Sequence, residues 1–154
     1  KKFIALNAQV NASNIGYHSL QKYKNIDATI INETELRHEM RNKNEDIKIL
    51  SKRLLKKLKT KHLLVTRGKI GSFLISANSN ELVESPAFAS NVVDKVGAGD
   101  AMLAIISMLI KIGAPKDLSL LLGSFAGAAS VESMGNSVFI NKESFLRHLE
   151  FALK

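Results

Sequence analysis

Short apolar runs alternate with longer stretches of helical periodicity along the chain. Runs of aliphatic and β-branched residues between polar segments are typical of buried strands, whereas apolar positions three and four residues apart indicate amphipathic helices. Such runs predict strands at residues 3–6, 28–31, 62–66, 72–76, 81–84 and 138–140. The helical pattern predicts helices at residues 13–23, 33–39, 46–58, 98–112, 118–134 and 142–153. This alternation predicts an α/β sandwich around a largely parallel sheet.

Two of the predicted strands are close enough in sequence to pair directly. Only the glycine-bearing segment at residues 67–71 separates residues 62–66 from residues 72–76, which favours an antiparallel hairpin. The helices predicted at residues 98–112 and 118–134 are mostly apolar or rich in small residues, so we expect both to be buried. Ligands bind beyond the carboxyl ends of the strands in such sheets. Polar residues at those ends are therefore the functional candidates.

The composition fits one folded domain. The chain has 154 residues, of which 45% are hydrophobic. The absence of cysteine excludes disulfides and thiolate metal sites, and no apolar segment is long enough to span a bilayer. We therefore expect a soluble, cytoplasmic protein with no membrane partner.

Much of the formal net charge of +8 comes from a lysine-rich stretch at residues 48–61. The apolar side chains of this stretch fall on one helical stripe, formed by Ile47, Leu50, Leu54 and Leu58. The cations lie on the other faces, as is typical of a solvated helix over a core. A nucleic-acid surface is the alternative, but the chain offers only two tyrosines and no tryptophan for stacking bases. We expect no nucleic-acid partner.

The most informative segment is Asp-Lys-Val-Gly-Ala-Gly-Asp at residues 94–100, which opens directly into an apolar helix. Glycines allow a tight turn, and the first turn of a helix presents unpaired N–H groups that bind anions. Asp100 lies just inside that turn, where a carboxylate can act as a general base. An ordinary loop with an acid in the first helical turn is the alternative. A Rossmann motif is excluded because Met102 replaces its third glycine, and no P-loop sequence occurs.

Three segments together resemble the PfkB (ribokinase-like) carbohydrate kinases. Residues 94–100 resemble the family signature D-T-x-G-A-G-D, residues 32–35 match its N-x-x-E motif, and residues 66–71 match its T-x-G-x-x-G element. All three occur in the family's order and cover most of the chain. The resemblance implies a ribokinase-like three-layer α/β/α sandwich with a mostly parallel sheet and an antiparallel hairpin.

The resemblance also implies roles for individual residues in phosphate transfer. Asp100 is similar to the base that deprotonates the sugar hydroxyl, and the backbone N–H groups of Gly97, Ala98 and Gly99 to the anion hole for the migrating phosphate. Asn32 and Glu35 resemble the pair that orders Mg²⁺ and phosphate, largely through water. On their own, Asn32 would be interpreted as a helix cap and Glu35 as a first-turn acid.

Further positions resemble the family's nucleotide and cation sites. The nucleotide-binding turn corresponds to Thr66, Gly68 and Gly71, which on their own would indicate a plain hairpin turn. The small-residue helix beside the adenine corresponds to Ser124, Ala126 and Gly127, which on their own would be packing residues. The monovalent-cation site of some members, for K⁺, corresponds to Asp94 and Gly135.

The chain also departs from the family pattern. Lys95 replaces the usual threonine, and we consider either a solvated loop lysine or a contact to a nucleotide phosphate; Met102 replaces a phenylalanine as a tolerated core exchange. Nothing corresponds to the family's N-terminal sugar-recognition half and β-lid. We therefore expect a truncated, C-terminal part of a kinase domain that is inactive alone. Residues 7–14, whose short amides on their own would indicate turns and caps, also resemble a branch allied to heptose-phosphate kinases.

The leading hypothesis is ATP-dependent phosphotransfer to a hydroxyl of a sugar or sugar phosphate. Its partners would be ATP with Mg²⁺ and the sugar, and the full-length protein would be a homodimer. The alternative is a non-catalytic nucleotide-binding or regulatory module within a larger polypeptide. A nucleic-acid-binding domain, suggested by charge alone, is the least favoured.

Overall fold

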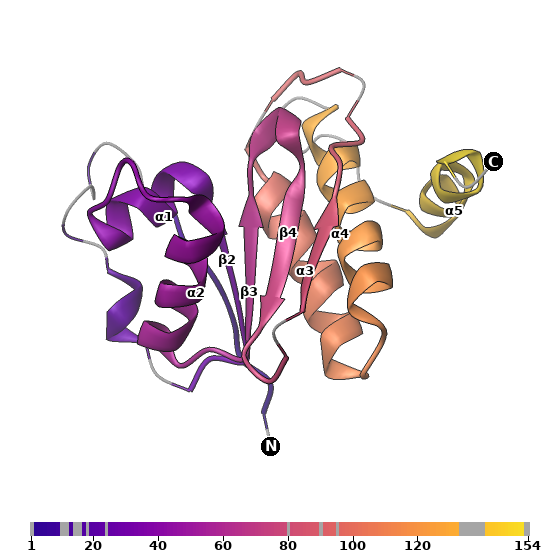
Figure 1. The fold of residues 1–154 in the computed structure, drawn as a ribbon. Helices are drawn as coiled ribbons and strands as arrows, with labels where there is room; N and C mark the ends of the chain where they lie inside the picture. Colours follow the sequence, from indigo (N-terminus) through magenta and orange to yellow (C-terminus); the bar gives the residue numbers. More distant parts are fainter. Residues whose placement is uncertain are drawn as a thin grey trace.

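The computed structural model describes residues 2–9, 13, 17, 19–23, 25–79, 81–89, 91–94, 96–132 and 141–152. One sheet runs through the molecule in the order β1-β2-β3-β4-β5 (Figure 1). Its strands are β1 (Ala5–Asn7), β2 (Ala28–Asn32), β3 (His62–Thr66), β4 (Ser72–Ser76) and β5 (Leu82–Ser85). The β1–β2 and β2–β3 pairs are parallel, and the β3–β4 and β4–β5 pairs are antiparallel. Four strands therefore share one direction and β4 opposes them, which confirms the mostly parallel sheet and the hairpin.

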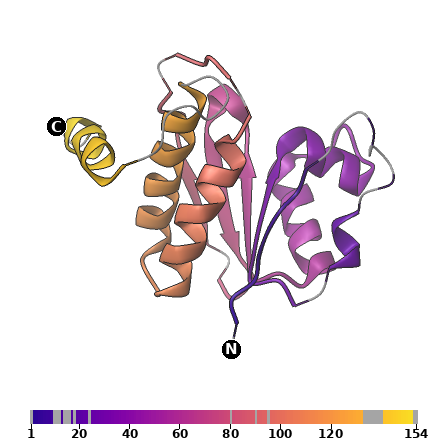
Figure 2. The same cartoon turned by 180° about the vertical axis from the view of Figure 1, so that it is seen from behind.

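Helices cover both faces of this sheet. On one face lie α1 (Glu33–Met40) and α2 (Ile47–Leu58), and on the other α3 (Ala98–Lys111) and α4 (Lys116–Val131) (Figures 1 and 2). The last helix, α5 (Lys142–Ala152), stands outside these layers on the α4 side (Figure 1). The three predicted layers are thus present. Among the described helices, none combines the length and hydropathy needed to cross a membrane.

The alternation of side chains along β2, β3 and β4 supplies two separate apolar cores. One core joins the sheet to α1 and α2, and its strand residues include Ile31, Leu63, Val65, Phe73 and Ile75. The other joins the sheet to α3 and α4 through Ile30, Leu64, Leu74, Met102, Ile106 and Leu120. Both faces of the central strands are therefore buried, which explains why the sequences of these strands are continuous apolar runs.

Helix α2 confirms the interpretation of the lysine-rich stretch. Its predicted apolar stripe is buried against the sheet, and Asp46 caps its first turn by accepting hydrogen bonds from the backbone N–H of Lys48 at 2.9 Å and of Ile49 at 3.1 Å. The exposed cations of this stretch include Lys52, Arg53, Lys56, Lys57 and Lys59. Burial of one stripe and solvation of the rest accounts for the local charge.

The structure differs from the sequence-based expectations in two places, and a third expectation lies outside the described residues. Among the described residues of 13–23 there is only the short 3-10 helix Leu20–Lys22, so the predicted α-helix is wrong. Leu20 alone is buried there, and the carboxylate of Glu39 on α1 holds the segment by accepting hydrogen bonds from Ser19, Leu20 and Gln21. Helix α3 is only half-buried, because its apolar residues surround the helix while one side meets the sheet; Met108 and Ile112 are exposed. The strand predicted at 138–140 lies outside the described residues.

Candidate functional site

The candidate site lies at the carboxyl edge of the sheet, the upper edge in Figure 1. Strands β1, β2 and β3 end there at Asn7, Asn32 and Thr66. The parallel register sets Asn32 directly beside Thr66, and the antiparallel register sets Thr66 beside Ser72 at the start of β4. Two of the predicted functional segments therefore meet as neighbours on adjacent strands.

Helix α3 begins at the same edge. Gly97 is its N-cap with a φ of 89°, a left-handed conformation that strongly favours glycine, and Gly97 contributes no side-chain cap. Ala98, Gly99 and Asp100 form the first turn, whose backbone N–H groups have no partners within the helix. Asp100 is exposed. The predicted anion-binding turn thus has the expected backbone form, with a carboxylate beside it.

Asp100 is joined to the end of β1. The side-chain amide of Asn7 donates a hydrogen bond from Nδ2 to Oδ1 of Asp100, with a separation of 2.6 Å. Gly99 lies against the same amide, because a Cβ built on Gly99 would sit 3.4 Å from Nδ2 of Asn7. This contact locates Asp100 at the sheet edge that also carries Asn32 and Thr66.

Asn32 and Glu35 form a reciprocal cap at the start of α1. The backbone N–H of Glu35 donates to Oδ1 of Asn32 at 2.8 Å, and the backbone N–H of Asn32 donates to Oε2 of Glu35 at 2.9 Å. Asn32 is exposed, whereas the Glu35 side chain is buried. The cap interpretation of these two residues is therefore confirmed.

The donor set at this edge suits a metal held mainly by phosphate and water. No cluster of three or more His, Asp or Glu side chains that could hold a metal occurs in the described part of the chain. Asn32 and Glu35 contribute an amide and a carboxylate, oxygen ligands of the kind Mg²⁺ prefers, but the cap already engages both. Mg²⁺ retains several waters in most protein sites, so this pair fits an indirect role.

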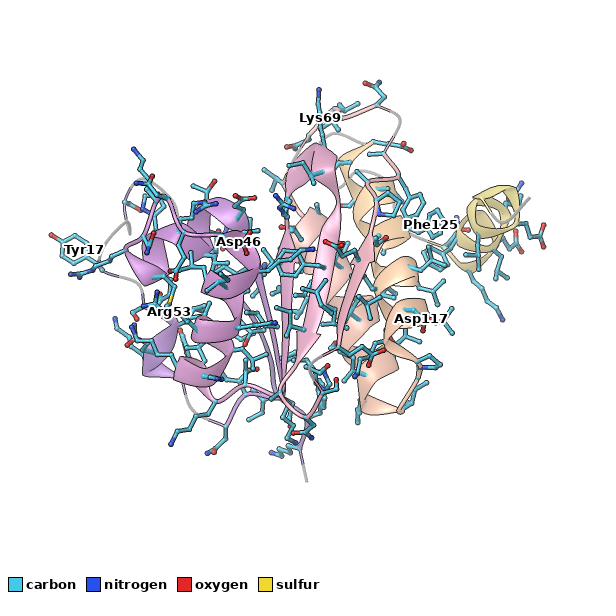
Figure 3. The ribbon with its side chains drawn as sticks, in the orientation of Figure 1. Tyr17, Asp46, Arg53, Lys69, Asp117 and Phe125 are labelled. Carbon is cyan, nitrogen blue, oxygen red and sulfur yellow. The ribbon has the colours of Figure 1, made fainter. Side chains whose placement is uncertain are left out.

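The turn between β3 and β4 depends on two glycines. Gly68 has a φ of 56° and begins a short 3-10 helix that ends at Ile70, and the backbone N–H of Arg67 closes the turn by donating to the carbonyl of Gly71 at 2.8 Å. Gly71 has a φ of 109°, and a Cβ there would lie 2.1 Å from the carbonyl oxygen of Ser85. Lys69 points outward from the turn (Figure 3). The turn is therefore pressed against the end of β5, which leaves no room for a side chain at Gly71.

An ion-pair network connects this turn to α1. Oε2 of Glu33 accepts a hydrogen bond from Nε of Arg67 at 2.9 Å, and Oε1 accepts from Nη2 of Arg37 at 2.8 Å. Partial burial pushes the pKa of Glu33 upward, but the hydrogen bonds and charges of Arg67 and Arg37 outweigh burial and hold the pKa below its ordinary value. Glu33 therefore remains ionised and fixes the turn relative to the Asn32 cap.

The predicted adenine-side residues Ser124, Ala126 and Gly127 are all part of α4. The hydroxyl oxygens of Ser72 and Ser124 lie 3.1 Å apart, and Ala126 is fully buried. A Cβ on Gly127 would meet Met102 of α3, 2.8 Å from Cγ, so glycine permits the close approach of α3 and α4. Phe125 of the same helix is labelled in Figure 3; its ring stacks on that of Phe88 with centroids 4.2 Å apart. Helix packing is thus visible at these positions.

The remaining predicted positions are only partly described. Asp94 lies beside the end of α4, because its backbone N–H donates to the carbonyl of Val131 at 3.1 Å; its Oδ1 accepts from the backbone N–H of Val96 at 3.0 Å. Lys95 and Gly135 lie outside the described residues. Met102 is buried in the core, which confirms its interpretation as a core exchange.

Sequence reasoning gave no role to Glu33 and Arg67, and it placed Asn7 only within the polar segment 7–14 after the first strand, without its contact to Asp100. Asn7 carried a detectable signal, since it is an amide at the end of an apolar strand. Glu33 and Arg67 lie inside the matched segments, but both occupy variable positions of those motifs. Their pairing joins residues 34 apart in sequence, and spacing alone does not predict it.

Comparison with known families and sequences gives a consistent result. The family described as pfkB family carbohydrate kinase matches residues 11–142. The bifunctional protein HldE of Shewanella loihica is 33% identical over 92 residues, covering 60% of this chain and 19% of that protein. HldE of Hahella chejuensis is 31% identical over 85 residues, covering 55% and 18%.

Solved structures share the fold. Arabidopsis thaliana ribokinase complexed with ribose and ATP has a TM-score of 0.77 at 24% identity, covering 97% of this chain and 48% of that one. Escherichia coli phosphofructokinase-2 in complex with potassium has a TM-score of 0.73 at 16% identity, covering 87% and 43%. These matches confirm the ribokinase-like architecture. They also cover less than half of each solved chain and about a fifth of each curated relative.

Proposed function

Because the chain belongs to the pfkB family of carbohydrate kinases, we propose that it transfers phosphate from ATP to a hydroxyl of a sugar or sugar phosphate. One observation carries the proposal: Asp100 lies in a helix turn with a glycine N-cap, at the sheet edge that also carries Asn32 and Thr66. Unpaired amides attract a phosphate, and an exposed carboxylate beside them can accept a proton.

Asp100 acts in this proposal as the general base. Its carboxylate removes the proton of the acceptor hydroxyl while the oxygen attacks the γ-phosphorus. The N–H groups of Gly97, Ala98 and Gly99 bind the oxygens of the migrating phosphoryl group, whose charge they stabilise. The left-handed conformation of Gly97 supports this role, because it presents the turn without a side chain over it.

The Asn32–Glu35 cap orders the metal-bound phosphates through water. Mg²⁺, bound together with ATP, supplies charge neutralisation of the phosphates. The cap holds the Asn32 amide and the Glu35 carboxylate in fixed positions, so neither has to be ordered when the nucleotide arrives. We assign a K⁺ site to the Asp94 region, as an extension of the family resemblance.

The nucleotide lies, in this proposal, along the turn and α4. Thr66, Gly68 and Gly71 approach its phosphates and ribose, and Ser124, Ala126 and Gly127 flank its base. The exposed backbone of Gly68 supports this placement, since nothing lies within 4 Å of the space a Cβ would take there. Glu33 supports it indirectly by anchoring Arg67 within the same turn.

Sugar recognition is assigned to the part of a kinase that the chain does not match. The solved ribokinase is matched over 48% of its length, so the other part of such a kinase is available for the sugar and its lid. We propose heptose phosphates as the first acceptors to test. Both the resemblance of residues 7–14 and the matches to HldE proteins motivate that choice.

The test is ATP turnover by the full-length protein across a panel of sugars and sugar phosphates. Asp100→Asn should lower kcat by about 10²–10⁴-fold, because it removes the base while keeping the side-chain shape. Asp117→Asn is the matched control. Asp117 is also an exposed first-turn acid, but it lies at the start of α4, at the opposite end of the helix layer formed by α3 and α4 (Figure 3). Undiminished turnover in Asp100→Asn would refute the proposal. Nucleotide binding by calorimetry without turnover of any acceptor would instead support a regulatory module.

A further inference from the structure

Asn7 is a polar residue on a strand position that faces a core. In the parallel pairing of β1 with β2, Asn7 lies beside Ile30, whose side chain belongs to the core under α3 and α4. The neighbours Leu6 and Ala8 pack into the opposite core. Asn7 is half-buried there, and a partly buried amide loses free energy unless it is hydrogen-bonded.

The hydrogen bond that Asn7 makes is directed at the carboxylate of Asp100. Its Nδ2 lies 2.6 Å from Oδ1 of Asp100, across 93 residues of sequence. Hydrogen bonds to ionised acceptors are shorter and stronger than neutral ones, so this one can fix the orientation of an otherwise exposed side chain. The Asn7 amide also lies against Gly99 in the first turn of α3, where an added Cβ would be 3.4 Å from Nδ2 of Asn7.

Asn7 does not act as a cap for α3. A cap would accept hydrogen bonds from first-turn N–H groups, whereas Asn7 donates a hydrogen bond from its Nδ2 to Oδ1 of Asp100. The N-cap residue itself, Gly97, has no side chain that could cap the turn. The contact is therefore specific to the carboxylate.

We propose that Asn7 is a positioning residue for Asp100, an inference that rests on the kinase function proposed above. The Nδ2–H bond holds Oδ1 and prevents rotation of the carboxylate, which directs Oδ2 toward the acceptor hydroxyl. The hydroxyl proton passes to Oδ2 as the hydroxyl oxygen forms a bond to the γ-phosphorus. The bond from the γ-phosphorus to the bridging oxygen breaks, and its electron pair leaves with ADP.

Two substitutions separate this role from a packing role. Asn7→Ala removes both the donor and most of the side-chain volume, whereas Asn7→Leu removes the donor and keeps the volume. We expect kcat to fall by about 10–10²-fold in both variants, because misplacing a reacting group by ~1 Å has effects of that size. The KM for ATP and the ATP affinity measured by calorimetry should stay within about threefold of wild type, since ground-state binding is retained. Asn44→Ala, at an exposed loop position, is the control.

A double-mutant cycle with Asp100→Asn tests whether Asn7 acts through Asp100. In the Asp100→Asn background, Asn7→Ala should cause no further loss of kcat, because the group that it positions is gone. Additive losses would overturn the inference, as would wild-type kcat in Asn7→Leu. Equal losses of melting temperature and ATP affinity in both Asn7 variants would also overturn it, by assigning Asn7 to folding. If Asp100→Asn itself keeps full turnover, the kinase proposal fails; if only the Asn7 variants do, that proposal stands and the positioning role fails.

Discussion

Gly71 gives a direct test of how the turn between β3 and β4 is packed. In Gly71→Ala the new methyl group would lie 2.1 Å from the carbonyl oxygen of Ser85 and 2.8 Å from the carbonyl carbon of Pro86. These are backbone atoms, so β5 or the turn itself has to move. Gly68→Ala is the matched control, because Gly68 also has a positive φ, of 56°, but nothing lies within 4 Å of its added Cβ.

The two substitutions share some contributions to stability and differ in others. Both alanines reduce the entropy of the unfolded chain equally, and Gly68→Ala adds only the left-handed conformation, which costs about 1–2 kcal/mol. Gly71→Ala adds strain of about 1–3 kcal/mol at a φ of 109°. Overpacking against Ser85 and Pro86 contributes a further ~1–3 kcal/mol. We therefore expect Gly71→Ala to be the more destabilising variant by about 2 kcal/mol, roughly a 30-fold difference in the unfolding equilibrium.

Urea unfolding of both variants, followed by circular dichroism, measures this difference. Linear extrapolation with equal slopes would give the two unfolding free energies on a common scale. Equal stabilities for Gly68→Ala and Gly71→Ala would show that the turn does not press on β5, and would refute the packing described here.

Two further predictions concern ionisable groups. Glu33→Gln should lower the free energy of unfolding at pH 7 by about 1 kcal/mol, because it removes two half-exposed ion pairs. Since the pKa of Glu33 is lowered in the folded state, the difference from wild type should be constant above the ordinary pKa of 4.5 and shrink as the pH falls below it. Urea titrations at several pH values can check this, and a difference that does not change between neutral and strongly acidic pH would contradict it. Burial lowers the pKa of His62, assisted by the charges of Lys116 and Lys61 and opposed by Asp27. The unfolded state then binds a proton more readily, so the free energy of unfolding should decline as the pH falls through about 6.5. In thermal unfolding, His62→Gln should make this decline smaller. An unchanged decline would exclude His62 as its source.

The parts of the fold that local pattern determines could be predicted from sequence. The stripe of α2 and the β3–β4 hairpin follow from periodicity and turn chemistry over short spans. The α3 turn followed from its glycines and from Asp100. For the 13–23 segment the local pattern failed, because contacts with Glu39 on α1 and burial of Leu20 determine its conformation.

The parts of the candidate site that depend on distant pairings could not be predicted. The Asn7–Asp100 and Glu33–Arg67 contacts join separate elements, and each depends on strand register and helix placement. The half-exposure of α3 was also hidden, since a helix that is apolar on all sides gives no indication of which side meets the sheet. Sequence supplied the candidate residues, and only the register showed which of them are neighbours.

The shortness of strand β1 affects how stable the contact between Asn7 and Asp100 is. It contains three residues, and in the described part of the sheet it is bonded on one side only, to β2. A strand of three residues makes few backbone hydrogen bonds, so it opens locally at a lower free energy than the longer strands of the sheet. Asn7 is the last residue of β1, so its contact with Asp100 would break in such an opening while the rest of the molecule stays folded. Local opening at the end of this strand is therefore the easiest way to disrupt the site.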